Sequence, residues 1–268
     1  MEHTDIQTLA SRVEGPVLLP GDEGYDEERT GANLAVRHEP EVIVGAARAG
    51  DVQEAVRFAA ERGPAVAVQC TGRGYAAARG GVLVTTSRMT GVEVDPDRRT
   101  VRVGAGVRFE QVIPATVPHG LAPLNGSAPH VGVVSYVLGG GVGLLVRTYG
   151  YASDRVRGLE LVTADGELRR VTADSEPDLY WAVVGDGGRP RQLRLYEKLF
   201  EALAPVSSGA RLTFLGFGAN AGENRVRAAY APADLERLTL LKTVHDPQNL
   251  FRLTYNIPPA ATDAASAN

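Results

Sequence analysis

The sequence predicts an α+β fold, and two kinds of pattern carry that prediction. Apolar runs at residues 42–44 and 65–68 flank an amphipathic segment, which together form a strand-helix-strand unit. Turn residues at 95–97 and 165–166 each separate two short segments typical of antiparallel hairpin strands. A chain that combines one such unit with separate hairpins favours the α+β class.

The helix of the first unit has clear start and stop signals. Asp51 is the expected N-cap, with Glu54 three residues later, and Gly63 and Pro64 end the helix. The flanking strands are expected to pair in parallel through a right-handed connection. One helical face is apolar and comprises Val52, Ala55, Val56, Ala59 and Ala60.

The remaining elements follow from the same patterns. Strands are expected at residues 82–85, 92–94, 100–103, 158–164 and 167–172, and helices at 108–117 and 176–181. After Gly188 the chain changes character and becomes rich in leucine and charge. There we expect helices at 191–203, 224–230 and 232–244, a strand at 211–217 and an apolar closing segment at 250–259.

Composition excludes several classes of protein. The 268 residues carry a formal net charge of −4, which lacks the basic footprint of a nucleic-acid-binding protein. The N-terminus has no apolar core of signal-peptide length, and no apolar stretch is long enough to span a bilayer. The single cysteine, Cys70, forms no internal disulfide. We therefore expect a cytoplasmic protein without a membrane or nucleic-acid partner.

Two glycine-rich stretches are the most informative features, at residues 70–77 and 125–143. Glycine lets main-chain N–H groups approach an anion closely, so both stretches suit a pyrophosphate. The first matches the dinucleotide pattern G-x-G-x-x-A, but a strand rather than a helix follows it, which argues against a Rossmann fingerprint. A tight turn remains the simpler explanation of this stretch when it is taken alone.

The ordered set of motifs resembles a known family. After the glycine-rich stretches come segments at 149–154, 161–166 and 178–182, and the closing segments at 246–252 and 256–259. Together they resemble the berberine-bridge-enzyme-like FAD-linked oxidoreductases, their bacterial members especially, over about residues 29–188 and 203–259. The resemblance implies a PCMH-type FAD-binding fold of two α+β subdomains, in which both glycine-rich loops cradle the FAD pyrophosphate.

The resemblance also implies a set of FAD-binding positions. In the first loop these are Thr71, Gly72, Arg73, Gly74, Tyr75 and Ala76. In the second loop they are Gly126, Ser127, Val131, Gly132, Val133, Ser135, Leu138, Gly139, Gly140 and Gly143. Val156 is expected near the adenine and Asn256 near the flavin ring.

Two positions depart from the family pattern. Family members commonly attach the flavin through a histidine in the first loop, where this chain has Arg73, and some use a cysteine where it has Ala128. Arginine forms no histidyl bond, so we expect non-covalent FAD. In one interpretation Arg73 pairs with the pyrophosphate or with an anionic reduced flavin, because a guanidinium suits such anions. In the other, Arg73 marks a position that is no longer selected for catalysis.

The region after Gly188 departs further. Too few residues separate Gly188 from the closing motif for the family's broad antiparallel substrate domain, so a truncated α/β remnant is expected. The catalytic tyrosine or glutamate of the family comes from that missing sheet, and no catalytic residue is assigned. The expected divisions are an N-terminal segment (1–35), an FAD-binding domain (36–188), a substrate-domain remnant (189–244), a closing segment (245–260) and a disordered tail (261–268).

Three functional hypotheses remain open. In the first, a small organic substrate resembling a secondary metabolite gives a hydride to FAD, and oxygen or another acceptor reoxidises the cofactor. In the second, the chain is an inactive FAD-binding remnant or binding module. In the third, a second copy or another partner covers apolar surface left by the missing sheet.

Other reactive side chains carry simpler explanations. His119, His130 and His245 show no metal-ligand spacing, and no metal is expected. Cys70 follows an apolar strand and is expected to be a structural thiol. Tyr136 and Tyr255 would either face the flavin or pack in the core.

Overall fold

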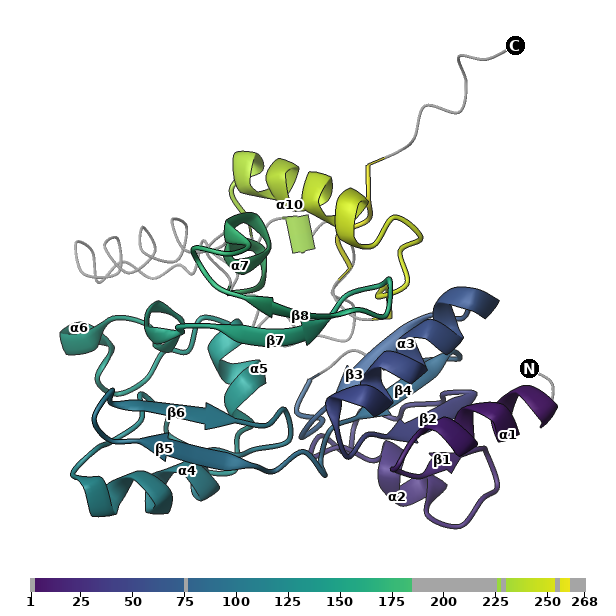
Figure 1. The fold of residues 1–268 in the computed structure, drawn as a ribbon, viewed down its shortest axis with the longest axis horizontal. Helices are drawn as coiled ribbons and strands as arrows, with labels where there is room; N and C mark the ends of the chain where they lie inside the picture. The colour runs from purple at the N-terminus through teal and green to yellow at the C-terminus, as the bar shows by residue number, and fades with distance from the viewer. Residues whose placement is uncertain (1–2, 75–76, 185–225, 228–229, 254–255, 261–268) are drawn as a thin grey trace.

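The computed structural model describes residues 3–74, 77–184, 226–227, 230–253 and 256–260 (Figure 1). The first part contains α1 (His3–Arg12), β1 (Val17–Leu18), α2 (Tyr25–Arg29), β2 (Val42–Gly45), α3 (Ala49–Arg62), β3 (Val66–Gln69) and β4 (Val82–Thr85). The second contains β5 (Val92–Asp95), β6 (Thr100–Val103), α4 (Phe109–Thr116), η1 (Val117–His119), α5 (Val133–Leu138), α6 (Val146–Tyr149) and η2 (Ala152–Arg155). The last elements are β7 (Leu159–Val162), β8 (Leu168–Val171), α7 (Pro177–Val183) and α10 (Pro232–His245).

A four-stranded sheet with the order β1-β2-β4-β3 organises the first part of the chain. Strands β2 and β3 both run parallel to β4, while β1 pairs with β2 in the antiparallel direction. The expected direct pairing of β2 with β3 is therefore wrong. Val82 of β4 lies opposite both Val42 and Val66, because β4 inserts between the two strands of the predicted unit.

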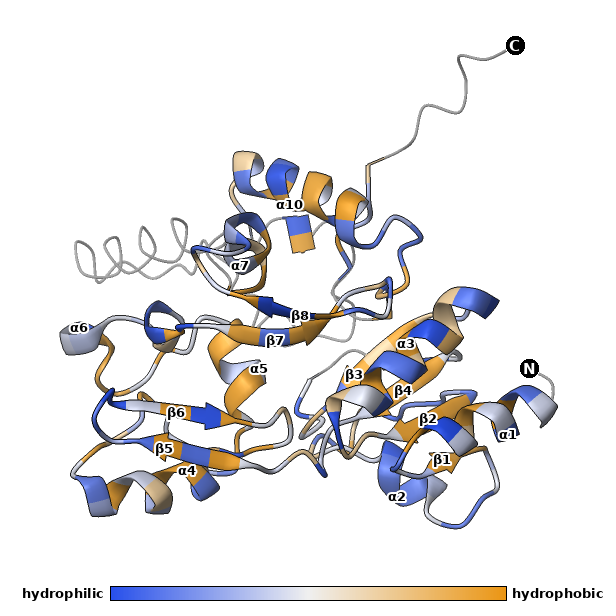
Figure 2. Cartoon of the chain, viewed as in Figure 1, coloured by the Kyte–Doolittle hydropathy of each residue, from blue (hydrophilic) through white to orange (hydrophobic). Residues whose placement is uncertain are grey.

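Helices lie on both faces of this sheet, which explains why its strands are mostly apolar (Figure 2). On one face, α1 and α3 pack over a core that includes Val44, Val66 and Val84, all at most 2% exposed. On the other face, Tyr25 of α2 packs with Ile43 and Leu83. The predicted helix face is confirmed, because its residues belong to the first core or pack against it.

The start of α3 differs from the expectation. The helix begins at Ala49 with Arg48 as its N-cap, so the assignment of the cap to Asp51 is wrong. The fully buried Asp51 carboxylate instead accepts main-chain N–H groups from Glu14, Gly15 and Ala47. It joins the segment before β1 to the start of α3, a long-range role that local cap signals do not reveal.

Two hairpins form the second part of the fold, β5–β6 and β7–β8, each in the expected place. Val107, Phe109, Val112 and Val133 make a separate core under the first hairpin. The turn of the second hairpin lies on α3, where Gln53 Nε2 donates to the Gly166 carbonyl at 3.0 Å. Helix α5, within the second glycine-rich stretch, was not predicted because its residues carry no cap signal.

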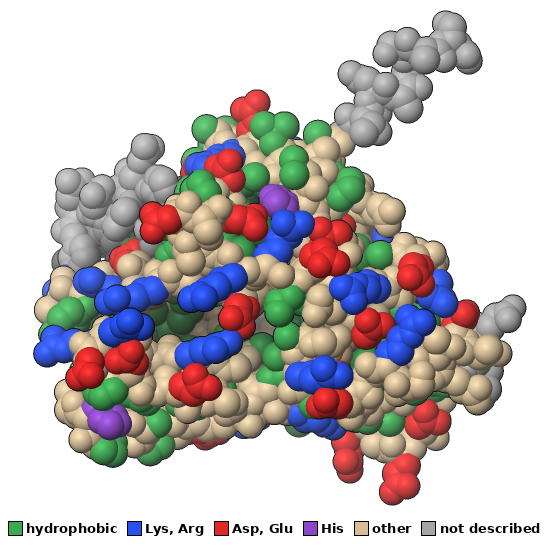
Figure 3. Space-filling model, viewed as in Figure 1, with side chains coloured by type: hydrophobic (Ala, Val, Ile, Leu, Met, Phe, Trp, Pro, Cys, Tyr) green, Lys and Arg blue, Asp and Glu red, His purple; other side chains and the backbone are tan. Residues whose placement is uncertain are grey.

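Basic and acidic side chains lie among one another on the face seen in Figure 3. Ion pairs such as Arg102–Glu160 and Arg57–Glu167 join neighbouring elements. Within the described ranges, no helix has the length and apolar character needed to cross a bilayer. The elements expected at 191–203 and 211–217, most of 224–230 and the tail at 261–268 lie outside these ranges.

The Asp51 contacts predict a specific loss of stability. Asp51→Ala removes the acceptor of three N–H groups, and we expect the free energy of unfolding to fall by about 3 kcal/mol in urea denaturation. Asp174→Ala, which removes an exposed carboxylate, is the control and should change it by less than about 0.5 kcal/mol. Equal effects of the two substitutions would contradict this role for Asp51.

Candidate functional site

The first glycine-rich loop follows β3 and is held along one side by an earlier segment of the chain. We call residues 31–39 the brace. Ala32 N–H donates to the Thr71 carbonyl at 2.8 Å, and Asn33 N–H donates to the Gly72 carbonyl at 3.0 Å. The Asn33 side chain adds a bond from Nδ2 to the Gly74 carbonyl at 3.2 Å. The brace thus engages the carbonyl groups of three loop residues.

Two glycines allow the brace and the loop to lie this close. Gly72 has φ +60, a left-handed conformation that favours glycine. A Cβ on Gly31 would lie 2.6 Å from the Cα of Gly72, and one on Gly72 would collide with the Gly31 Cα. Any side chain at either position would separate the two backbones.

The far end of the brace is fixed by His38. Its Nδ1 accepts the Ala78 N–H at 3.0 Å, and its carbonyl accepts a bond from Nη1 of the buried Arg29. Burial and the positive charge of Arg29 lower the pKa of His38. The imidazole therefore stays neutral, as an Nδ1 acceptor must.

The second glycine-rich loop runs beside residues 107–110 and then enters α5. Phe109 N–H donates to the Val131 carbonyl, and Val133 N–H donates to the Val107 carbonyl. A Cβ on the buried Gly132 would lie 3.0 Å from Cys70 Sγ and 3.5 Å from Thr71 Cγ2. The structure therefore brings the two predicted loops together at Gly132.

Three further glycines of the second loop surround Tyr136. Its ring lies against Gly126, Gly141 and Gly143, and it meets Phe109 edge to face with centroids 5.2 Å apart. Gly140 and Gly141 have positive φ angles, and their carbonyls accept the N–H groups of Ser153 and Ala152. Tyr136 thus packs against the core under the first hairpin, which was one of the two predictions for this residue.

The closing segment is anchored by Asp246, which is 4% exposed. Its carboxylate accepts N–H groups from Leu250 and Phe251 and pairs with Lys242 of α10 at 2.5 Å. Leu250 is buried in the core against α3, and its carbonyl accepts the Val66 N–H at the edge of the sheet. This anchoring fixes the course of the chain from Asp246 to Phe251.

The predicted site residues lie in three places. Asn256 is half-buried, and its Oδ1 is buried without a hydrogen-bond partner among the described residues. Val156 follows η2, and its carbonyl accepts the Tyr180 hydroxyl at 2.6 Å. Arg73 is exposed and makes no ion pair with any described residue. The positions of Tyr75, Ala76 and Tyr255 fall outside the described ranges.

The loop residues offer polar main chain rather than a nucleophile or a metal centre. Burial raises the pKa of the Cys70 thiol, which favours its unreactive protonated form. Across the described part of the chain, no three His, Cys, Asp or Glu side chains cluster as metal ligands would. Ser127 and Ser135 are exposed at the edge of the second loop. The arrangement suits an anionic ligand held by backbone groups.

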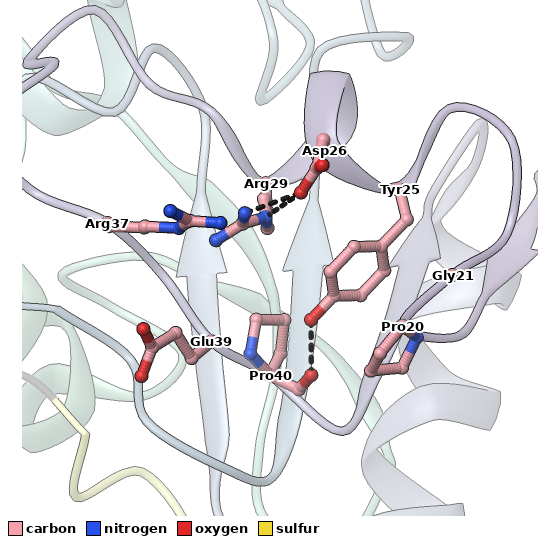
Figure 4. Close-up of a pocket in the computed structure, with 8 residues that line it drawn as sticks. All are labelled: Pro20, Gly21, Tyr25, Asp26, Arg29, Arg37, Glu39 and Pro40. Atoms are coloured by element: carbon pink, nitrogen blue, oxygen red, sulfur yellow. Dashed lines mark hydrogen bonds and ion pairs between the residues drawn. The ribbon is translucent and has the colours of Figure 1, made fainter.

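A surface pocket of about 350 Å³ lies on the α2 side of the brace (Figure 4). Its lining carries charges of both signs, from Asp26, Arg29, Arg37 and Glu39. None of the predicted site residues lines it. The pocket is therefore separate from the meeting point of the two glycine-rich loops.

Sequence reasoning missed the brace residues Asn33 and His38. Neither belongs to a glycine-rich stretch, and their partners lie about 40 residues later in the chain. The sequence before β2 contains a Gly-Ala-Asn step and two charged residues beside a histidine, a pattern without a known local meaning. Only the folded chain shows that these polar groups meet the first loop.

Two family models match the chain. A model described as an FAD binding domain matches residues 40–172, which include both glycine-rich loops. A model described as berberine and berberine like matches residues 211–258, which include α10 and the Asp246 anchor.

Curated relatives match well over half of the chain. (R)-6-hydroxynicotine oxidase of Paenarthrobacter nicotinovorans is 34% identical over 65% of this chain and 39% of its own length. FAD-linked oxidoreductase OXR2 of Pyricularia oryzae is 30% identical over 82% of this chain and 41% of its own length. The matched part of the chain thus spans about two fifths of the length of these relatives.

Solved structures match to the same extent. The 6-hydroxy-D-nicotine oxidase of Arthrobacter nicotinovorans superposes with a TM-score of 0.60 at 34% identity, covering 66% of this chain and 40% of that one. The berberine-bridge-enzyme-like protein 1 of Physcomitrella patens gives 0.62 at 28% identity, covering 67% and 40%.

The close approach of Gly72 and Gly31 predicts different effects for two glycines of one loop. Gly72→Ala places a methyl group against the Gly31 backbone at a left-handed φ, and we expect the free energy of unfolding to fall by about 2 kcal/mol. Gly74→Ala is the matched control, because no atom of the other described residues beyond its chain neighbours lies within 4 Å of its added Cβ. It should change stability by less than about 0.5 kcal/mol in urea denaturation. A control as damaging as Gly72→Ala would contradict the contact.

Proposed function

The chain belongs to the berberine-bridge-enzyme-like FAD-linked oxidoreductases with a PCMH-type FAD-binding fold, and from that premise we propose that it binds FAD non-covalently and oxidises a small organic substrate. Bound FAD would accept a hydride from the substrate and pass the electrons to oxygen or another acceptor. The substrate class is a secondary-metabolite-like alcohol, sugar or amine.

The meeting of the two glycine-rich loops at Gly132 carries this proposal. A side chain at Gly132 would press on Cys70 and Thr71, so glycine lets the two loops approach each other closely. Main-chain N–H groups of Gly72 and Arg73 make no hydrogen bond within the described residues, which leaves them for a pyrophosphate. The unpartnered Asn256 Oδ1 supports a polar contact from the closing segment to the same ligand.

Non-covalent attachment rests on Arg73. Its guanidinium has no ion-pair partner among the described residues and is exposed in the first loop, so it is available to pair with a phosphate. Neither Arg73 nor Ala128 offers the nitrogen or sulfur nucleophile needed for a covalent bond to the flavin ring. These two positions favour a cofactor held by hydrogen bonds and charge alone.

A second candidate is an FAD-binding protein without turnover. The observation that favours it is the extent of the match, which spans 39% to 41% of the relatives named above. No described residue is assigned as a catalytic base. Both candidate proteins bind FAD at the same site. They differ in whether a substrate reduces the bound FAD.

The FAD site predicts the colour of the purified protein. We expect a flavin absorption spectrum, with all of the flavin released into the supernatant by acid precipitation because no covalent bond retains it. A colourless protein that stays colourless after incubation with FAD would overturn the proposed function. Yellow protein whose flavin stays in the acid pellet would overturn non-covalent binding alone.

Two additions to this experiment sharpen it. In Arg73→His, part of the flavin should stay in the pellet if position 73 lies at the flavin ring, whereas Arg73→Ala should release all of it.

Anaerobic incubation with a panel of alcohols, sugars and amines then separates the oxidoreductase from the FAD-binding protein without turnover. Bleaching of the flavin by one compound supports the oxidoreductase, and its absence across the panel favours the binding protein.

A further inference from the structure

We infer that Asn33 is a positioning residue for the FAD site, because it turns the N–H groups of the first glycine-rich loop toward the pyrophosphate. The inference rests on the proposed function and deepens it. Asn33 lies outside both family-model matches, which cover residues 40–172 and 211–258.

The argument begins with the geometry of the peptide bond. In a planar trans peptide, the carbonyl and the following N–H point in opposite directions. Ala32 and Asn33 engage the carbonyls of Thr71 and Gly72, so these two oxygens face the brace. The N–H groups of Gly72 and Arg73 must therefore point away from it.

An anion needs the orientation that the brace imposes. Successive N–H groups around a residue in the left-handed conformation form a concave anion site, and Gly72 supplies that conformation with φ +60. If the Thr71 and Gly72 peptides were free to rotate, their carbonyl oxygens would face the pyrophosphate in part of the population and repel it. Fixing these two peptides before FAD binds raises the affinity for FAD, because less conformational entropy is then lost on binding.

Asn33 contributes more to this brace than any neighbouring residue. Its main chain bonds to Gly72, its Nδ2 bonds to Gly74, and its Oδ1 accepts the Ala35 N–H at 3.2 Å, which holds the side chain in place. It spans three residues of the loop from one position. The adjacent Leu34 is 82% exposed and takes no part in these bonds.

The brace is itself anchored, so it can hold the loop rather than move with it. Figure 4 shows the Tyr25 hydroxyl of α2 donating to the Pro40 carbonyl, at 2.6 Å, and Arg29 paired with Asp26. Arg29 also donates to the His38 carbonyl at 2.6 Å. Helix α2 packs on the sheet through Tyr25, which ties the brace to the core.

The test compares FAD binding by the full chain and three variants, measured by the quenching of flavin fluorescence. Asn33→Ala keeps the main-chain bond to Gly72 but removes the side-chain bonds to Gly74 and Ala35, which leaves the loop less firmly held, and it should raise the Kd for FAD about tenfold. Leu34→Ala is the matched control and should leave the Kd unchanged. Asn33→Gln keeps an amide donor and should bind FAD at least about threefold more tightly than Asn33→Ala.

A second measurement separates positioning from stability. The melting temperature of the apoprotein should change by less than about 4 °C in Asn33→Ala, since the bond lies at the surface. Unchanged FAD affinity in Asn33→Ala, or a loss that the Gln variant does not recover, would overturn the inference while the proposed function stands. A wild-type chain that does not bind FAD would overturn both.

Discussion

The contact between the backbones of Gly31 and Gly72 is the constraint on which the candidate site depends. Hydrogen bonds from Ala32 and Asn33 reach the first loop only because neither glycine carries a side chain. This contact sets the direction of the loop peptides, and Gly132 sets how closely the second loop approaches them. Backbone shape, more than any reactive side chain, therefore defines what the site can bind.

The parallel sheet supplies the rigid support for this arrangement. The first loop and the segment after Thr85 begin side by side, because the parallel strands β3 and β4 end at the same side of the sheet. The Asp246 anchor acts at the opposite end of β3, where Leu250 accepts the Val66 N–H. Segments far apart in the sequence thus converge around one strand.

Local patterns predicted most elements, because burial and turn chemistry act over a few residues. Strand β4 and the two hairpins agree with the expected ranges to within a few residues, and Gly63 ends α3 as its left-handed φ requires. The family resemblance, carried by the order of the motifs, is confirmed by the two family models. The FAD-binding positions inferred from the sequence stay predictions, although the structure brings Thr71 and Gly132 together.

Three features escaped prediction because they depend on partners distant in sequence. Strand order requires knowing that β4 inserts between β2 and β3, and no local pattern encodes that. The spacing of Asp51 and Glu54 predicts a helix N-cap, but the Asp51 carboxylate accepts the main-chain N–H groups of residues 14 and 15. The role of Asn33 depends on Gly74, which lies 41 residues later.

Amide hydrogen exchange, measured residue by residue with and without FAD, tests the central claim most directly. The account predicts that FAD slows exchange at Gly72 and Arg73, whose N–H groups are free of protein partners in the described structure. Exchange at Ala32 and Asn33 should be slow in both states, because their N–H groups already bond to the loop. Bound FAD that leaves Gly72 and Arg73 unprotected would contradict the account.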